Sequence, residues 1–458
     1  CIYKFFNLEY KGINMGKKSR EKFNRRNDGG GEAKAVQHAS QAGLEKALVL
    51  IIQWATYLVM FTPLIVNTDF FFPFVAPKTI FFRIVVEIML AAYLLLVLMN
   101  RKYRPRLNHL TIATSLFLLV FIITSFTGVN FSRSFWSTYE RMTGILTMLH
   151  LGAFFIVLIS VFKKRSDWDK FLGAYIVVGV LLSLYVLTSN QLSTRGGGTI
   201  GNTSFMAAYL LFDIFFAMIL FLAKRGPWQI FAGTSLLVML PVIFTSTARG
   251  AIGAFVMALF LMFLGYLIFS GKKLMKRAGI AMILLLMVSS IFLAVAQPPV
   301  VKGVAQTMQE EMRSRFVVWE TGWKGFLERP ILGWGPENFN VVFLKNFNPC
   351  MSLAECGSEV WFDRVHNIFL DTLVTTGIVG LLSYLAIFAA AIFGLIKVMS
   401  QTADKRNLFF PLGLTALFIA YIAQNMLVFD KINSYLVFFL ALAFTGFNII
   451  RQGEKEEQ

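Results

Sequence analysis

Residues 278–296 read AGIAMILLLMVSSIFLAVA, a stretch of 19 residues without a charged side chain. A helix rises about 1.5 Å per residue, so a run of this length crosses most of the hydrocarbon core of a membrane. In lipid, a single segment satisfies its own backbone hydrogen bonds only as a helix. The stretch therefore predicts a membrane-spanning helix.

The pattern recurs along the whole chain. The chain has 458 residues, 57% of them hydrophobic and 15% charged, whereas an ordinary soluble domain has about 25% charged residues. We predict an all-α integral membrane protein with about twelve transmembrane helices. The apolar runs are Leu44–Val66, Thr79–Met99, Leu110–Phe126, Gly144–Phe162, Phe171–Thr188, Thr203–Leu222, Gln229–Thr245, Ala251–Ser270, Ala278–Ala296, Ile378–Val398, Leu408–Val428 and Ser434–Ile450.

The cations predict the orientation of these helices. The chain has 43 Lys and Arg against 25 Asp and Glu. In a soluble protein this balance would suggest nucleic acid, but here the cations gather in alternate loops, so no nucleic-acid partner is expected. We predict a multi-pass protein of the plasma (inner) membrane with both termini in the cytoplasm. The basic clusters on that side are Arg101–Arg106, Lys163–Arg165, Lys224–Arg225, Lys272–Arg277 and Lys405–Arg406.

The predicted domain organisation has three parts. Residues 1–43 are polar and basic, and we expect them to be a disordered cytoplasmic tail. Residues 44–450 form the polytopic membrane domain, and residues 451–458 form a second cytoplasmic tail. Within the membrane domain, residues 297–365 form one long extracytoplasmic loop between the ninth and tenth spans.

Part of this long loop has the spacing of an amphipathic helix. The helix is expected to end at Arg329-Pro330, and Gly333-Trp334-Gly335-Pro336 to form a turn. Arg315 precedes Trp319 by about one helical turn, so both side chains can face one ligand. A structural cap over the membrane helices is the alternative. The apolar positions are Val304, Met308, Met312, Phe316, Trp319, Trp323 and Leu327.

The outer loops carry more arginine than the positive-inside rule predicts. Arginine binds phosphate and carboxylate through two parallel hydrogen bonds, whereas lysine is a hydrated point charge. Eight arginines against five lysines at the outer lip therefore suggest a lipid ligand with phosphate groups; pairing with loop carboxylates is the simpler alternative. The arginines are Arg133, Arg141, Arg195, Arg249, Arg313, Arg315, Arg329 and Arg364, and the lysines are Lys78, Lys302, Lys324, Lys345 and Lys431.

One histidine lies where the long loop re-enters the membrane. His366 precedes a short predicted helix that runs to Thr376 and ends at Gly377. The positive end of that helix and the charge of Arg364 both keep an imidazole neutral, which is the state that a general base needs. Asp363 is placed to hydrogen-bond the ring. His150, inside the fourth span, is expected to form a helix–helix hydrogen bond.

The two cysteines of the long loop are a candidate disulfide. Cys350 and Cys356 lie on the predicted extracytoplasmic side, where a disulfide is permitted. No Cys/His spacing resembles a zinc site, and no Asp-x-Asp pair lies in an outer loop. We expect neither a metal ion nor a cofactor.

Four segments, in this order, resemble the O-antigen ligase family, which includes related polysaccharide polymerases. The resemblance covers most of the chain from about Leu44 to Ile450. The segments are Arg195-Gly-Gly-Gly-Thr199-Ile-Gly201-Asn202, Thr245-Ser-Thr-Ala-Arg249-Gly250, the Arg315-x-x-x-Trp319 helix followed by Gly333-Trp-Gly335-x-x-Asn338-Phe339, and His366-Asn367-x-Phe-Leu370 leading to Gly377.

This resemblance implies an inverting glycosyltransferase that faces the extracytoplasmic side. Members of the family transfer a glycan from an undecaprenyl-pyrophosphate carrier to an acceptor hydroxyl, which a glycan, lipid or protein can supply. The resemblance implies that Arg249 and Arg315 hold the pyrophosphate and that His366 is the general base. Arg195, Arg141, Arg364 and Asp363 have no such firm match and are candidate helpers.

Two other functions stay open at this point. One is a polysaccharide polymerase of the same family, which has the same motifs. The other is a multi-span transporter or flippase of lipid-linked glycan. Transporters place ionisable groups near the bilayer midplane and have internal repeats. The candidate intramembrane charges are few, namely Arg83 with Glu87, His150 and Asp213, and no convincing repeat is evident, which favours an enzyme.

Overall fold

The computed structural model describes residues 41–189, 196–296, 298–299, 302–303, 306, 309–310, 312–356, 359–402 and 404–456. Within these residues the fold is all-helical, without a strand. Each predicted apolar run has a matching helix. The helices are Gln41–Leu64, α2 (Ala76–Met99), α3 (His109–Thr127), α5 (Ile145–Val161), α6 (Arg165–Thr188), α7 (Thr203–Ala223), α8 (Pro227–Thr245), α9 (Arg249–Phe269), α10 (Lys273–Ala296), α14 (Ile368–Gln401), α15 (Phe409–Asn425) and α16 (Ile432–Glu456).

Among the described residues, ten of these helices are long and apolar enough to cross a membrane. The other two, α5 and α15, have 17 residues each, which corresponds to about 25 Å. The predicted all-α membrane fold is therefore confirmed, while the number of spans stays a prediction. The predicted tail of residues 1–43 lies outside the described residues up to residue 40. Residues 41–43 belong to the first helix rather than to the tail.

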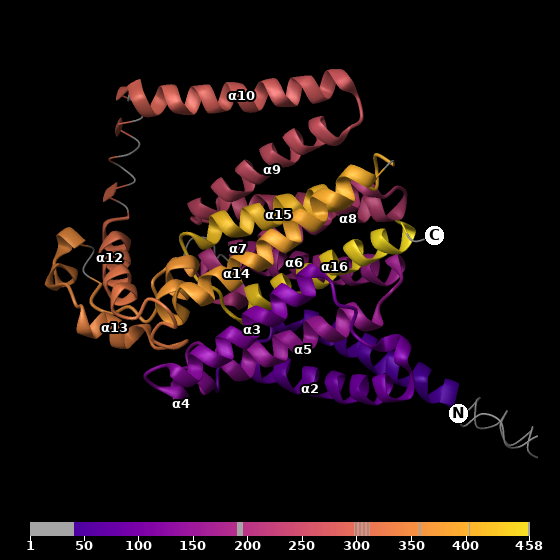
Figure 1. Ribbon diagram of the computed structural model, residues 1–458, viewed down its shortest axis with the longest axis horizontal. Helices are drawn as coiled ribbons and strands as arrows, with labels where there is room; N and C mark the ends of the chain where they lie inside the picture. The colour runs from indigo at the N-terminus through magenta and orange to yellow at the C-terminus, as the bar shows by residue number, and fades with distance from the viewer. Residues whose placement is uncertain are drawn as a thin grey trace, which may run out of the picture.

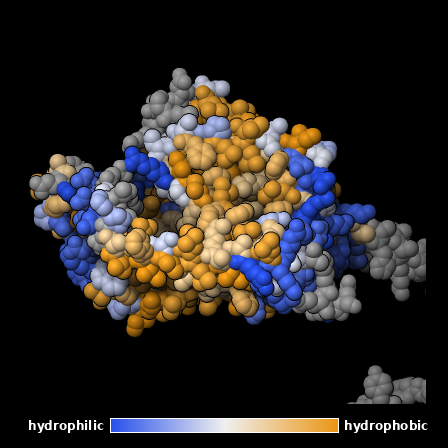
Figure 2. Space-filling view, turned by 90° about the horizontal axis from the view of Figure 1, so that it is seen from above, coloured by the Kyte–Doolittle hydropathy of each residue, from blue (hydrophilic) through white to orange (hydrophobic). Residues whose placement is uncertain are grey.

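The loops gather at the two ends of the bundle (Figure 1). Both described termini lie at one end, together with the turns α9–α10 and α14–α15. The opposite end carries the short helices α4 (Phe131–Trp136), α12 (Arg313–Glu328) and α13 (Phe339–Lys345). Figure 2 shows a broad apolar surface between polar ends. This arrangement is what a membrane helix bundle with both termini on one side requires.

Helices α7 and α16 form the centre of the bundle. The apolar windows of these two helices are 78% and 83% buried inside the protein, whereas that of α10 is 6% buried. Figure 1 shows α10 running apart from the other helices and joined to α9 by a turn. A helix that is apolar on all sides and has so few protein neighbours is solvated by lipid.

Asparagine begins several of these helices. The side chains of Asn108, Asn130, Asn202 and Asn367 accept hydrogen bonds from backbone N–H groups in the first turn of α3, α4, α7 and α14. Such caps satisfy donors that a helix leaves without partners at its start. Two of these asparagines, Asn202 and Asn367, belong to the motifs identified in the sequence, so those motif positions also fix where α7 and α14 begin.

Helix α14 is broken at Gly377, which has φ +67° and ψ −172°. The break separates the predicted short helix up to Thr376 from the predicted tenth span. It also leaves two carbonyl groups without helical partners, and the preceding loop supplies donors to them. The N–H groups of Trp334 and Gly335 donate to the oxygens of Val374 (3.1 Å) and Thr375 (2.7 Å), and the N–H of Ile378 donates to Pro330 O (2.8 Å). The long outer loop is thereby fixed to the start of α14.

The outer loop has a small hydrophobic core of its own. Val318 of α12, Phe339 and Val342 of α13, and Val365 and Val374 near the break are all buried there. Helix α12 ends at Glu328 with Arg329 as its C-cap, so the predicted end is confirmed. The expected first turns, with Val304 and Met308, lie outside the described residues.

The intramembrane charges Arg83 and Glu87 both form hydrogen bonds with residues of α5 or of the turn before it. Arg83 donates to Thr147 Oγ1 and to Met142 O. Glu87 accepts from Nε2 of His150 at 3.1 Å, which confirms the expected helix–helix hydrogen bond between α2 and α5. The charge of Glu87 also acts on Arg83, so the two residues interact while each forms its hydrogen bonds with another part of the chain.

Candidate functional site

His366 lies directly before the N-cap of α14, at the loop-rich end that carries α12. Its backbone has φ +57°, a conformation that a non-glycine residue rarely adopts. The ring lies edge-on to Phe362 and Phe429, with centroids 5.1 and 5.0 Å away. Its Nδ1 lies 3.1 Å from the carbonyl oxygen of Arg364. Because a carbonyl oxygen only accepts, Nδ1 must carry the proton, so Nε2 is the basic nitrogen.

The surroundings of His366 favour the neutral ring. Burial lowers the pKa of His366 to about 4, and the positive charges of Arg315 and Arg141 act in the same direction. Asp363 and the hydrogen bond to Arg364 O oppose the shift. A neutral imidazole at this position was predicted from the helix terminus and Arg364. The larger cause is burial between aromatic rings, and the cations that contribute are Arg315 and Arg141.

Arg141 and Asp363 form a fixed pair beside this histidine. The Nε and Nη2 atoms of Arg141 donate to the two carboxylate oxygens of Asp363 at 2.7 and 2.9 Å. Its guanidinium also lies over the ring of Phe429, 4.9 Å from the centroid. Burial would raise the pKa of Asp363, but its contacts with Arg141 hold that pKa below the usual value. Asp363 therefore binds Arg141 rather than the ring of His366, contrary to the sequence-based expectation.

Arg315 approaches His366 from α12. It is partly buried, and burial lowers the pKa of Arg315 more than the charge of Glu359 raises it. Trp319 follows one turn later, and its buried indole N–H has no hydrogen-bond partner in the described part of the chain. A guanidinium and an unpartnered N–H donor on one helix face are suited to an oxyanion ligand.

Arg249 is the first residue of α9, and its side chain is exposed. The next residue, Gly250, packs against Leu427 and Gln424: a Cβ there would lie 3.1 Å from Leu427 Cδ1 and 3.3 Å from the Gln424 amide oxygen. Leu427 belongs to the short loop between α15 and α16 that also carries Phe429. The start of α9 is therefore anchored to the loop that contacts His366 and Arg141.

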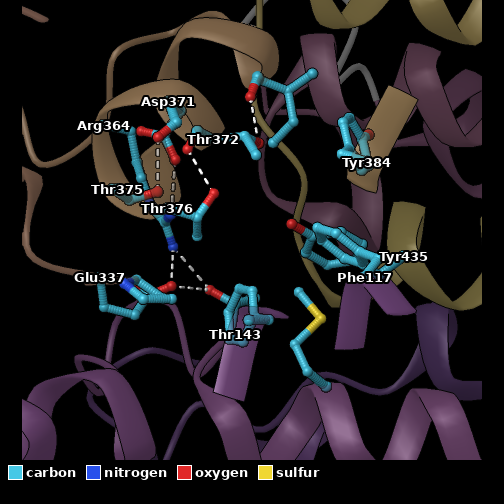
Figure 3. A pocket seen from close by; sticks show the side chains of 14 residues that line it. Phe117, Thr143, Glu337, Arg364, Asp371, Thr372, Thr375, Thr376, Tyr384 and Tyr435 are labelled. Atoms are coloured by element: carbon cyan, nitrogen blue, oxygen red, sulfur yellow. Dashed lines mark hydrogen bonds and ion pairs between the residues drawn. The ribbon is translucent and has the colours of Figure 1, made fainter. Parts of the chain in front are cut away.

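Arg364 has a different environment from the other arginines (Figure 3). It is buried and forms ion pairs with Glu337 and Asp371, the second at 3.1 Å, and it donates to Thr143 Oγ1 at 2.9 Å. The carboxylates outweigh the effect of burial, so the pKa of Arg364 is raised above its usual value. Because its N–H groups bind Glu337, Asp371 and Thr143, Arg364 fixes the turn that contains His366.

A small cavity lies next to this network. Thr143, Glu337, Arg364 and Asp371 line one side, and Tyr384 and Tyr435 line another (Figure 3). Its volume is about 20 Å³, which is about the space of one water molecule. It is therefore too small for a sugar or a pyrophosphate.

Backbone strain gathers around the same residues. In the described part of the chain, four residues other than glycine have positive φ: Ser137, Met142, Glu337 and His366. Ser137 Oγ donates to Glu337 Oε2 at 2.7 Å, Met142 lies between Arg141 and Thr143, and Glu337 binds Arg364. Strained backbone persists only where the surroundings hold it, and it is concentrated at functional sites.

Two lysines lie close to this cluster. Lys431 packs over Phe205, 4.2 Å from the ring centroid, and burial together with Arg141 lowers the pKa of Lys431 to about 8. Lys78 is fully buried and donates to Ile65 O and Thr199 O, both at 2.6 Å. Thr199 belongs to the glycine-rich motif that follows Arg195. Arg195 itself lies outside the described residues.

Cys350 and Cys356 form a disulfide with their Cα atoms 5.6 Å apart. The bond closes a small loop that packs on the core of the outer segment. Among the described residues, no group of three or more His, Cys, Asp or Glu side chains is arranged to hold a metal ion.

The sequence identified the cations of this site more readily than their partners. Glu337, Asp371 and Thr143 bind Arg364. Phe429 packs against His366, and Lys431 lies near Arg141 and Asp363. Glu337 lies between two motif residues, Gly335 and Asn338, which was a usable signal. Phe429 and Lys431 lie in the last outer loop, where no motif was recognised.

The comparison with known families agrees with this site. Residues 234–385 match the family model described as O-antigen ligase, a range that includes Arg249, Arg315, Asp363, Arg364 and His366. The chain is also 23% identical over 344 residues to the exopolysaccharide production protein ExoQ of Rhizobium meliloti (strain 1021), covering 71% of this chain and 76% of that protein. Residues 234–385 therefore resemble the O-antigen ligase family that the motifs predicted, and three of the four motifs lie within this range.

Proposed function

We propose that the protein transfers a glycan from an undecaprenyl-pyrophosphate carrier to an acceptor hydroxyl at the outer face of the plasma membrane. The observation that carries the proposal is the placement of His366. Its Nδ1 is bound to Arg364 O, which leaves Nε2 as a base, and the charges of Arg315 and Arg141 act on its ring. A basic nitrogen beside guanidinium groups suits a reaction in which a hydroxyl loses a proton and a diphosphate leaves.

The reaction proceeds in one displacement. Nε2 of His366 takes the proton of the acceptor hydroxyl while the oxygen attacks the anomeric carbon of the donor. The bond from that carbon to the pyrophosphate oxygen breaks, and undecaprenyl pyrophosphate leaves with the electron pair. Attack from the face opposite the leaving group inverts the anomeric configuration. The proton on His366 then passes to water.

Some of the arginines bind the pyrophosphate, and others position the residues of the site. Arg315 and Arg249 neutralise the charge that develops on the leaving pyrophosphate, each through two charge-assisted hydrogen bonds. Arg141 is held by Asp363, so it adds charge near His366 while its orientation stays fixed. Arg364 positions the histidine turn through Glu337 and Asp371. Arg195 remains a candidate helper. No step requires a metal ion.

Binding of the donor raises the pKa of His366. A pKa of about 4 keeps His366 neutral at physiological pH, but such a nitrogen is only a weak base. The two negative charges of a bound pyrophosphate would offset Arg315 and Arg141 and raise the pKa of His366. The histidine would therefore become a stronger base only when the donor is in place.

The relative named above favours a second version of the same chemistry. That protein is described as an exopolysaccharide production protein, so the acceptor hydroxyl here could belong to another glycan chain, as in a polysaccharide polymerase. The two versions differ in the acceptor and share the donor, the base and the leaving group. A flippase, in contrast, would move the lipid-linked glycan and break no bond.

The test is release of undecaprenyl pyrophosphate from a lipid-linked glycan by the purified protein in detergent. We expect release with the natural chain and a loss of about 10²–10⁴ in rate for His366→Ala. His109→Ala is the matched control, because His109 is exposed at the start of α3, at the opposite end of the bundle. Full activity of His366→Ala would refute the mechanism, and absence of release by the natural chain would favour transport.

A further inference from the structure

A second charged groove lies at the other end of the molecule, where the turn from α9 to α10 meets the turn from α14 to α15. Lys272, Lys273 and Lys276 contribute to it from the first turn, and Lys405 from the second. The groove has a volume of about 520 Å³, within the range of about 300–1,000 Å³ typical of ligand clefts. It is at the end opposite His366, so the proposed transfer reaction does not use it.

The charge of this groove is uncompensated. In the part of the chain that the structure describes, none of the four lysines forms an ion pair with a carboxylate. The nearest acidic residue in sequence, Asp404, accepts hydrogen bonds from the Arg406 N–H and the Asn407 side chain. Four positive charges from two separate turns around one space favour an anionic ligand.

The lining of the groove is apolar as well as basic. Phe269 and Met399 line it together with the lysines. Leu274, which follows Lys273, is 80% exposed, and the helix that begins here, α10, is only 6% buried within the protein. Figure 1 shows this helix set apart from the bundle beyond the turn. The groove is thus basic at its rim and continues onto a surface that lipid must cover.

We propose that this groove binds an anionic phospholipid, with the phosphodiester headgroup among the four lysines and the acyl chains along α10. Basic pockets between transmembrane helices on the cytoplasmic side are suited to such headgroups. A water-soluble phosphate ester has the same charged group and no chains to cover the exposed apolar surface. The lipid therefore accounts for both the basic and the apolar part of the lining, and its chains would cover the exposed apolar surface of α10.

The test is lipid binding by the full chain, purified in neutral detergent and stripped of lipid, measured by native mass spectrometry. The probes are phosphatidylglycerol, phosphatidylcholine with the same acyl chains, and glycerol 3-phosphate. We expect selective binding of phosphatidylglycerol and about thirtyfold weaker binding by the variant K276Q/K405Q, because each basic residue contributes roughly fivefold. The matched control, K164Q/K170Q, removes two exposed lysines of α6 and its N-cap and should change the affinity less than about threefold.

Three outcomes would overturn the proposal. Equal loss of binding in the two variants would mean general attraction to a basic face. Equal binding of phosphatidylcholine would mean that the lysines do not recognise the headgroup. Displacement of phosphatidylglycerol by millimolar glycerol 3-phosphate would identify a site for soluble phosphate esters. Thermal unfolding without lipid serves as the folding control, and it should be unchanged because all four substituted lysines are exposed.

Discussion

His366 combines a strained backbone with a fixed ring. The strain of a left-handed residue costs of order 1–3 kcal/mol, and it persists here because three contacts hold the turn: the cap by Asn367, the ion pairs of Arg364 and the hydrogen bond from Val365 N to Asp371 Oδ1. The ring is held between Phe362 and Phe429. These contacts point one nitrogen, Nε2, away from the backbone, which is what a positioned base requires.

The pH dependence of kcat/KM follows from two groups at this site. His366 has to be neutral to act as a base, and its pKa is about 4, so the rate should fall only as the pH drops towards 4. Lys431 has a pKa of about 8, so its positive charge near the donor should be lost as the pH rises above 8. A pH–rate profile of the purified protein checks both limbs. Lys431→Gln should remove the alkaline limb alone, whereas an unchanged limb would exclude Lys431.

The two proposed pyrophosphate ligands should not tolerate lysine. Arg315→Lys and Arg249→Lys keep the charge but lose the planar pair of donors, so we expect kcat/KM to fall by about tenfold or more, in line with the loss of one charge-assisted hydrogen bond. Arg313→Lys is the matched control, because Arg313 is exposed and lies two residues before Arg315 on α12. Equal activity of all three variants would remove the two arginines from the mechanism.

At the scale of single elements, the break in α14 connects the membrane bundle to the site. The short helix before Gly377 carries Asp371, which binds Arg364, and the long helix after it crosses the bundle. The carbonyl groups freed at the break accept from Trp334 and Gly335. Glu337 lies two residues after Gly335 and also binds Arg364. The break of α14 at Gly377 therefore brings both Glu337 and Asp371 to the guanidinium of Arg364.

Gly377→Ala should consequently destabilise the protein and impair the site. The residue has φ +67°, and a Cβ would lie 2.1 Å from Ile331 O. This combination of positive φ and extended ψ is essentially restricted to glycine and costs an alanine of order 1–3 kcal/mol. The clash would in addition push the loop of residues 330–335 away. Thermal unfolding in detergent should show a lower midpoint. Gly253→Ala in α9 is the control: nothing lies within 4 Å of its Cβ position, so it should be neutral or slightly stabilising. Equal midpoints would refute the role of the break.

The sequence predicted the membrane helices and their ends because local composition determines them. It did not predict the carboxylate partners of Arg364, because these depend on tertiary packing. A run such as residues 278–296 has one possible structure in lipid, so length and composition suffice. Gly377 and Arg329-Pro330 mark helix ends through their backbone preferences alone. The partners of Arg364 are 27 residues away at Glu337 and seven away at Asp371, although Asp363 and Glu359 are closer to it in sequence. Only the packing of α4, α12 and α14 decides between them.

At the scale of the whole molecule, the two ends have different cations. The end with α12 carries the arginines around His366, and the other end carries the termini and the four-lysine groove. Lysine clusters are typical of the cytoplasmic side of a membrane protein. At the opposite end, Arg141 and Arg364 are paired with carboxylates, and Arg315 and Arg249 are the arginines that the proposed function assigns to the ligand. The charge distribution thus predicts the compartment of each end, and the disulfide between Cys350 and Cys356 supplies a natural reporter of the outer one.

Labelling of cysteines tests this orientation in sealed right-side-out membrane vesicles. A membrane-impermeant maleimide should modify Cys350 and Cys356 only after an impermeant reductant has been added, because the disulfide is expected to face the oxidising side. Cys1 is replaced by serine so that it does not contribute. The inner reporter is Ser166→Cys, an exposed position at the start of α6, in a chain whose natural cysteines are serine. It should react only after detergent opens the vesicles. The reverse pattern would place His366 in the cytoplasm, where a glycan acceptor at the cell surface could not reach it, and would refute the proposed function together with the topology.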